Sequence, residues 1–208
     1  MIIHATGLGK RYNRDWIFRN LSLSIGPVAK IAILGPNGSG KSTLLQCLWG
    51  QTIPTEGSIR YEQDGSAIEP EDLNTAITIA TPNMDLIEEF TLREQLDFHY
   101  HYKRPVRSME PADLADRIGL PFSSDKRIRE FSSGMKQRLK LGLALLSEAS
   151  VTFLDEPTTN LDKAAERWYF ELISEVSDRT LIIATNVETD LPDGAARINI
   201  SDHKWTPK

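Results

Sequence analysis

Residues 35–43 read GPNGSGKST and are the clearest candidate for chemistry in the chain. Gly35 to Ser42 fits GxxxxGK[ST], in which the backbone N–H groups of a glycine-rich loop surround phosphate groups. In that pattern Lys41 reaches the β- and γ-phosphates and the Ser42 hydroxyl binds Mg²⁺. A ligand-free glycine turn is the competing interpretation, but an apolar strand pattern precedes the loop and a helical pattern follows it. We therefore predict a nucleoside triphosphate site formed by Gly35, Pro36, Asn37, Gly38, Ser39, Gly40, Lys41, Ser42 and Thr43.

A second candidate is the segment VTFLDEP, residues 151–157, in which two carboxylates end an apolar strand pattern. The carboxyl ends of strands form the edge where α/β sheets bind ligands. At that edge Asp155 could hold magnesium, and Glu156 could polarise a water for in-line attack on the γ-phosphate. A solvated Asp-Glu loop is the alternative. The apolar strand and the upstream phosphate loop favour the catalytic interpretation.

Two further segments, FSSGMKQR at 131–138 and TTNLD at 158–162, flank this strand. With GPNGSGKST and LDEPTTNLD, they make essentially the whole chain resemble the ABC ATPase family, the nucleotide-binding subunits of ATP-binding cassette transporters. Kinases and GTPases share only the first motif, so a kinase acting on a small molecule is disfavoured. The resemblance implies Mg²⁺ and ATP as cofactors and two chains that sandwich two ATP molecules head to tail.

The resemblance also implies roles for residues outside the phosphate loop. Ser132, Ser133 and Gly134 match the signature segment that reaches the γ-phosphate held by the opposite subunit. A helix N-terminus does attract anions, although a simple helix cap explains the same residues. Tyr12 matches the aromatic that stacks on adenine, against the alternative of a core aromatic. Asp162 matches the aspartate of the loop that joins the two active sites.

Three segments depart from the family pattern. Asn83 stands where the family has a magnesium-contacting glutamine, and Asn186 stands where it has a switch histidine. The signature contains Ser133 and Met135 where glycine and glutamine are usual. An asparagine cannot become a cation at physiological pH, so we expect ATP binding to persist and hydrolysis to be slow. The expected catalytic residues are Lys41, Glu156 and Asn186, and the expected magnesium ligands are Ser42, Asn83 and Asp155.

Strand and helix patterns that alternate along the chain predict an α/β fold. We expect a P-loop NTPase core with a mostly parallel sheet, an N-terminal antiparallel β subregion and a helical insertion. Strands are expected at residues 2–5, 21–25, 28–34, 58–61, 77–80, 151–154 and 181–185. In the insertion, Thr91 and Glu94 form a capping box and a second helix covers 111–118. We expect one domain over 1–208, with its core at about 1–82 and 131–208 and a helical subdomain at about 83–130.

Composition limits the class of protein. The chain has 208 residues, 24 basic and 29 acidic, with a net charge of −5, so we expect no nucleic-acid partner. A single cysteine, Cys47, cannot form an internal disulfide, and the first residues lack the apolar core of a secretory signal. No apolar run approaches the roughly 18 residues that cross a bilayer. We expect a cytoplasmic protein, peripheral at the inner face of the cell membrane through a partner.

These observations favour the ATP-binding and ATP-hydrolysing subunit of an ABC transporter, working as a homodimer or heterodimer on a separate membrane-spanning subunit. The resemblance implies that residues 84–130 receive a helix from that subunit. The alternative is a soluble ABC ATPase that remodels ribosomes or DNA. Such proteins usually resemble twin cassettes or carry a long coiled coil, whereas this chain has one cassette and no heptad run. Its short length also resembles small exporter ATPases, including those of heme export for cytochrome c maturation.

Overall fold

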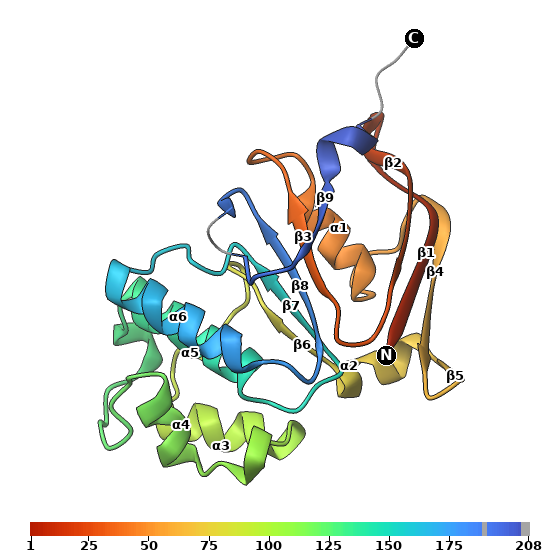
Figure 1. The fold of residues 1–208 in the computed structure, drawn as a ribbon. Helices are drawn as coiled ribbons and strands as arrows, with labels where there is room; N and C mark the ends of the chain where they lie inside the picture. The colour runs from red at the N-terminus through yellow and green to blue at the C-terminus, as the bar shows by residue number, and fades with distance from the viewer. Residues whose placement is uncertain (189–190, 205–208) are drawn as a thin grey trace.

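A computed structural model describes residues 1–188 and 191–204 and contains two sheets (Figure 1). The five-stranded sheet is parallel throughout and has the order β6-β7-β8-β3-β9. Its strands are β3 (Lys30–Leu34), β6 (Ile77–Ala80), β7 (Val151–Asp155), β8 (Thr180–Thr185) and β9 (Ala196–Asn199). The four-stranded sheet is antiparallel, in the order β2-β1-β4-β5. Its strands are β1 (Ile2–Tyr12), β2 (Asp15–Ile25), β4 (Glu56–Gln63) and β5 (Ser66–Ile68). The predicted α/β fold class is confirmed.

The central strands of the parallel sheet lie in the interior of the protein, whereas its edge strand β9 is largely exposed. Every residue of β7 and β8 is buried, as expected for near-continuous apolar strands covered on both faces. The hydroxyls of Thr78 on β6 and Thr152 on β7 form a hydrogen bond with each other at 2.8 Å. The carboxyl ends of all five strands therefore form one edge, and the loops that leave this edge lie beside one another.

Helix α1 (Lys41–Leu48) follows β3 and lies between the two sheets (Figure 1). Leu44, Leu45 and Leu48 are fully buried in a cluster shared with β1, β2, β3, β7 and β8. This packing fixes the start of α1 at the carboxyl edge of the parallel sheet.

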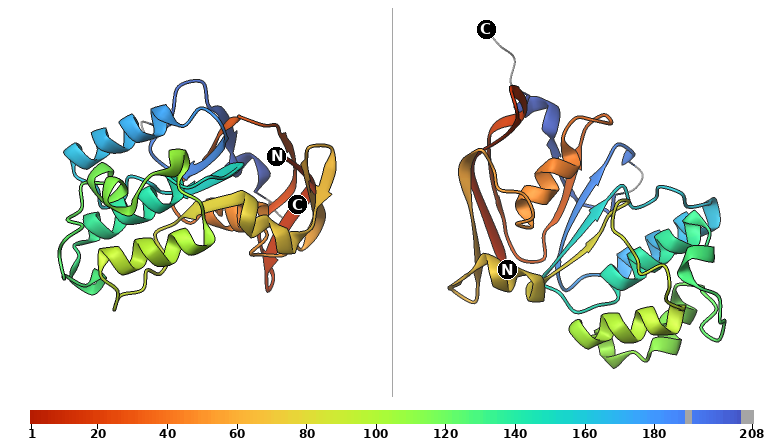
Figure 2. Two further views of the ribbon diagram at one scale, coloured as in Figure 1. Left: turned by 90° about the horizontal axis from the view of Figure 1, so that it is seen from below. Right: turned by 180° about the vertical axis from the view of Figure 1, so that it is seen from behind.

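The other main helices are gathered away from the antiparallel sheet, as both views of Figure 2 show. They share a second apolar cluster, to which α5 contributes Leu139, Leu141 and Leu143. These helices are α3 (Leu92–Tyr102), α4 (Pro111–Arg117), α5 (Ser133–Leu145) and α6 (Lys163–Glu175). Short elements complete the order: η1 (Pro70–Asp72), α2 (Leu73–Ala76), η2 (Val106–Ser108), η3 (Ile128–Glu130) and η5 (Ile200–His203). Within the described residues, no helix combines the length and apolar character needed to span a membrane.

Several boundaries differ from the sequence prediction. Strand β1 extends to Tyr12 and β2 starts at Asp15, because antiparallel pairing continues past the apolar residues on which the prediction relied. Val28 was expected in a strand, but it is 52% exposed with φ of 59°, in the turn before β3. Strand β9 was not predicted. Its register is set by pairing with β3 rather than by an apolar pattern of its own.

Candidate functional site

The phosphate loop connects β3 to α1 and opens into a cavity of about 560 Å³. Gly40 precedes α1 with φ of 105°, and a Cβ at this position would collide with Ile17. Only glycine fits both that backbone conformation and that close approach. Residues 37–43 line the cavity, together with Ile17, Pro82, Glu156, Thr159 and Asn186.

Lys41 is buried in this cavity and makes three polar contacts. Its Nζ donates to the backbone oxygens of Gly35 at 2.9 Å and Pro36 at 3.3 Å. The same ammonium lies 3.0 Å from Oε1 of Glu156. The structure thus brings together the cation of the first motif and the carboxylate of the second.

Asp155 ends β7 beside Ser42 and is buried. Burial raises the pKa of its carboxyl, and the Glu156 charge acts in the same direction, whereas the Ser42 hydrogen bond and the Lys41 charge oppose the rise. Its Oδ1 has no hydrogen-bond partner. This oxygen is free to bind a cation, and carboxylate and hydroxyl oxygens suit Mg²⁺.

The third expected magnesium ligand lies on the same side. Ser42, Asn83 and Asp155 all line a second cavity, of about 490 Å³, which shares Ser42 with the phosphate cavity. The residues present therefore fit a magnesium ion next to the phosphate loop.

Glu156 is held in a backbone conformation that is uncommon outside glycine. Its φ is 45°, in the left-handed region. The Glu156 N–H donates to the Ala184 oxygen at 2.8 Å, and the Glu156 oxygen accepts from the Thr159 N–H at 3.1 Å. These bonds on both sides fix the direction of the side chain toward the cavity. Strained residues of this kind cluster at functional sites.

Asn186 follows β8 and lines the same cavity. Its Nδ2 donates to Oδ1 of Asn37 in the phosphate loop at 3.0 Å. An amide nitrogen carries two hydrogens, so this bond leaves one donor for another acceptor. Asn186 is thus tied to the loop by a contact that links residues 149 positions apart.

The other expected ATP-binding residues lie outside the lining of this cavity. Tyr12 ends β1 with 47% of its surface exposed, and Lys10 Nζ lies 5.0 Å from its ring centroid. Ser132 caps α5 by accepting from the Met135 N–H at 3.2 Å. Asp162 caps α6 and accepts from the N–H groups of Ala164 and Ala165 at 3.1 and 2.8 Å. Ser133 and Gly134 begin α5.

Sequence reasoning missed two buried polar residues of α5, Gln137 and Lys140. Gln137 donates to the Pro157 oxygen and Lys140 to the oxygens of Thr81 and Pro82. Only part of their signal is present in the sequence: both are polar and three positions apart, so they lie on one side of the helix, but their partners are distant in the chain. Polar residues with that spacing on a core-facing helix need buried partners.

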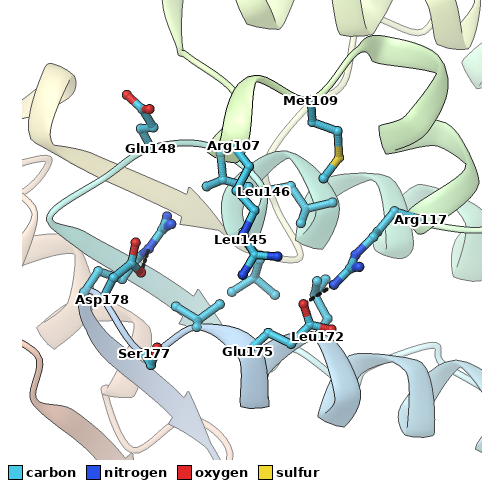
Figure 3. Close-up of a pocket in the computed structure, with 13 residues that line it drawn as sticks. Arg107, Met109, Arg117, Leu145, Leu146, Glu148, Leu172, Glu175, Ser177 and Asp178 are labelled. Carbon is cyan, nitrogen blue, oxygen red and sulfur yellow. Dashed lines mark hydrogen bonds and ion pairs between the residues drawn. The ribbon is translucent and has the colours of Figure 1, made fainter.

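A different cavity, of about 230 Å³, lies between η2, α4 and the last turns of α5 and α6 (Figure 3). Its floor contains Leu145, Leu146 and Leu172, and an ion pair of Arg117 with Glu175 crosses its rim. Its edge at residues 177–179 precedes β8, so it lies at the amino end of that strand. It therefore takes no part in the phosphate site at the carboxyl edge.

Comparison with known proteins gives one consistent family. The family described as ABC transporter matches residues 18–159. The Nod factor export ATP-binding protein I of Rhizobium johnstonii is 31% identical over 193 residues, which are 89% of this chain and 61% of that protein. The zinc import ATP-binding protein ZnuC of Cereibacter sphaeroides is 34% identical over 190 residues, which are 91% and 73% of the two chains. A dimeric bacterial ABC transporter cassette superposes with a TM-score of 0.80 at 22% identity, covering 95% and 94%.

Proposed function

The chain belongs to the ABC transporter family, and we propose on this premise that it binds and hydrolyses ATP for a transporter. The observation that carries the proposal is the meeting of Lys41 and Glu156, 3.0 Å apart, in the cavity of the phosphate loop. A cation for the phosphates and a carboxylate for the attacking water are the two groups that this reaction needs in one place. The relatives named for Nod factor export and zinc import support transport over remodelling of ribosomes or DNA.

In the proposed mechanism, the N–H groups of the phosphate loop and the Lys41 ammonium bind the β- and γ-phosphates. Ser42, Asp155 and Asn83 would hold Mg²⁺, which neutralises charge on the phosphate oxygens. Glu156 orients the water for in-line attack. Asn186 donates its remaining amide hydrogen to the γ-phosphate, without the positive charge of a histidine.

We further propose that two chains share their sites. Ser132 caps α5 and Gly134 lies in its first turn, and both are outside the lining of the cavity that contains Lys41, which suits a role toward the ATP of a second subunit. Asp162 is proposed to connect the two sites, and Tyr12 to stack on adenine with its exposed ring. The second subunit is either an identical chain or a related one.

The helical insertion is the proposed docking site for a membrane-spanning subunit. Phe98 and Tyr102 on α3 are exposed, and their rings contact each other edge to face with centroids 5.3 Å apart. Exposed aromatic side chains are typical anchors of protein interfaces. Docking of this kind places the chain at the membrane surface through its partner.

The proposal is tested with the purified full chain by titration calorimetry with Mg-ATP and by release of phosphate. We expect ATP to bind and phosphate release to require Mg²⁺. Failure of the wild-type chain to bind ATP would refute the proposed function. Recovery of a membrane-spanning subunit with the tagged chain, cross-linked through residues 84–130, tests the docking surface. Cross-links confined to the rest of the chain would place the partner elsewhere.

A further inference from the structure

Helix α5 carries two polar side chains that are almost fully buried. Gln137 is 4% exposed and Lys140 is 9% exposed. The Gln137 Nε2 donates to the Pro157 oxygen at 2.8 Å. The Lys140 Nζ donates to the Pro82 oxygen at 2.6 Å and to the Thr81 oxygen at 3.3 Å. Residues three apart lie on one side of a helix, so a single face of α5 holds two separate segments.

Both segments carry residues of the candidate site. Pro157 directly follows Glu156, the residue expected to orient the water. Thr81 and Pro82 leave β6 and directly precede Asn83, an expected magnesium ligand. Each bond from α5 therefore ends within one or two residues of a group that would act on ATP.

Backbone hydrogen bonds fix part of these two segments, and the side chains of Gln137 and Lys140 hold the two prolines within them. Proline has no N–H, so Pro82 and Pro157 can be held through hydrogen bonds only by their oxygens. Pro157 is buried, and a buried oxygen that loses its donor costs more than an ordinary hydrogen bond contributes. Pro82 is exposed, so water can replace part of the bond to its oxygen. Burying the Lys140 ammonium also lowers its pKa, so the contact is retained despite an unfavourable desolvation.

The first turn of α5 contacts the same region. A Cβ on Gly134 would lie 3.1 Å from the Asn160 oxygen, so the helix start and the loop after Glu156 are in close contact. The signature residues, the Glu156 loop and the Asn83 segment are thus attached to a single helix.

We propose that Gln137 and Lys140 are positioning residues that couple the signature residues of α5 to the two segments carrying Glu156 and Asn83. The inference rests on the proposed function, because the signature residues are taken to contact the ATP of a second subunit. When α5 shifts on contact with that ATP, both segments move with it. Glu156 and Asn83, which are expected to orient the water and to bind magnesium in the same chain, then move as well. Gln137 acts on the segment that carries Glu156, and Lys140 acts on the segment that carries Asn83.

The experiment compares hydrogen–deuterium exchange of the full chain with the variants Lys140→Met and Gln137→Met. Methionine keeps the length and loses the donors. We expect Lys140→Met to speed exchange about tenfold at residues 83–86 and to leave residues 158–161 unchanged. Gln137→Met should do the reverse. Lys126→Met, at an exposed lysine, is the matched control and should change neither segment.

Kinetics give a second measurement. Each Met variant should lower kcat about tenfold with the KM for ATP within about twofold, because small displacements of reacting groups affect the chemical step most. Lys140→Arg, which keeps donors at this position, should restore slow exchange and most of kcat. This variant keeps the test decisive if Lys140→Met folds poorly.

The separate positioning roles would be overturned if residues 83–86 of Lys140→Met exchanged at the wild-type rate. They would also be overturned if either substitution sped up exchange in both segments. Loss of kcat in Lys140→Arg equal to that in Lys140→Met would also overturn the role of the Lys140 donor. Failure of the wild-type chain to bind ATP is a distinct result that refutes the proposed function. The exchange contrast is measured without nucleotide, so it decides the attachment of the two segments by itself.

Discussion

The phosphate loop and the groups that would act on the γ-phosphate are built in different ways. The loop is local: Lys41 donates to Gly35 and Pro36, six and five positions away. The groups that would act on the γ-phosphate are instead assembled by contacts between distant residues, such as Asn186 with Asn37, 149 positions apart. On the proposed function, phosphate binding would therefore be encoded mainly in one short segment, whereas hydrolysis would depend on tertiary packing. Substitutions should be able to separate the two.

The largest expected effect comes from breaking the local region. Lys41→Ala removes the ammonium that would bind the phosphates, and we expect Mg-ATP affinity to fall on the order of a hundredfold or more. Titration calorimetry measures this, with Lys126→Ala as the control for loss of a surface cation. Unchanged affinity would show that the loop does not bind phosphate through this residue.

The next effect should separate hydrolysis from binding. Glu156→Gln keeps the shape of the side chain and loses the base, so we expect kcat to fall about a hundredfold while ATP still binds. With turnover blocked, the proposed two-chain complex should persist in saturating ATP. Phosphate release and light scattering measure the two results. Glu175→Gln, in the surface pair with Arg117, should keep wild-type activity, and equal losses in both variants would contradict the assignment.

A smaller effect is expected at Asn186, where the contact is polar but uncharged. Asn186→His should raise kcat about tenfold with little change in KM, because the gain is made mainly in the transition state. The gain should be largest below about pH 6.5, where an ordinary imidazole is protonated. Steady-state kinetics between pH 6 and 8 check both results. An equal or lower turnover in the folded variant would show that Asn186 is not at the switch position.

The smallest effect concerns stability on the helical side, which should leave ATP affinity unchanged. Burial, with the nearby Lys103 charge, lowers the pKa of His99 to about 4. Because the unfolded chain binds this proton near pH 6.5, His99 lowers stability as the pH falls from about 6.5 toward 4. At pH 5.5 the loss is about 1.4 kcal/mol. His99→Gln should remove it in urea unfolding at pH 7.5 and 5.5, whereas the exposed His101→Gln should not.

Motifs with local geometry were predictable from the sequence. The strand, loop and helix around Lys41 and the Thr91 capping box are both present. Features that depend on distant partners were not. The pattern of β9 is too polar to predict a strand without its pairing to β3. The roles of Gln137 and Lys140 depend on carbonyl oxygens 20 and 58 positions away, which no local spacing identifies.

The ion pair between Lys41 and Glu156 has a consequence for the timing of hydrolysis. The Lys41 ammonium pairs with the Glu156 carboxylate, and the phosphates of ATP would compete for the same ammonium. A phosphate that binds Lys41 weakens its hold on Glu156 and leaves that carboxylate to accept a hydrogen bond from water. On the proposed function, the pair would therefore tie the base to the substrate: Glu156 would stay paired with Lys41 until ATP binds, and ATP would then free the carboxylate for its own cleavage.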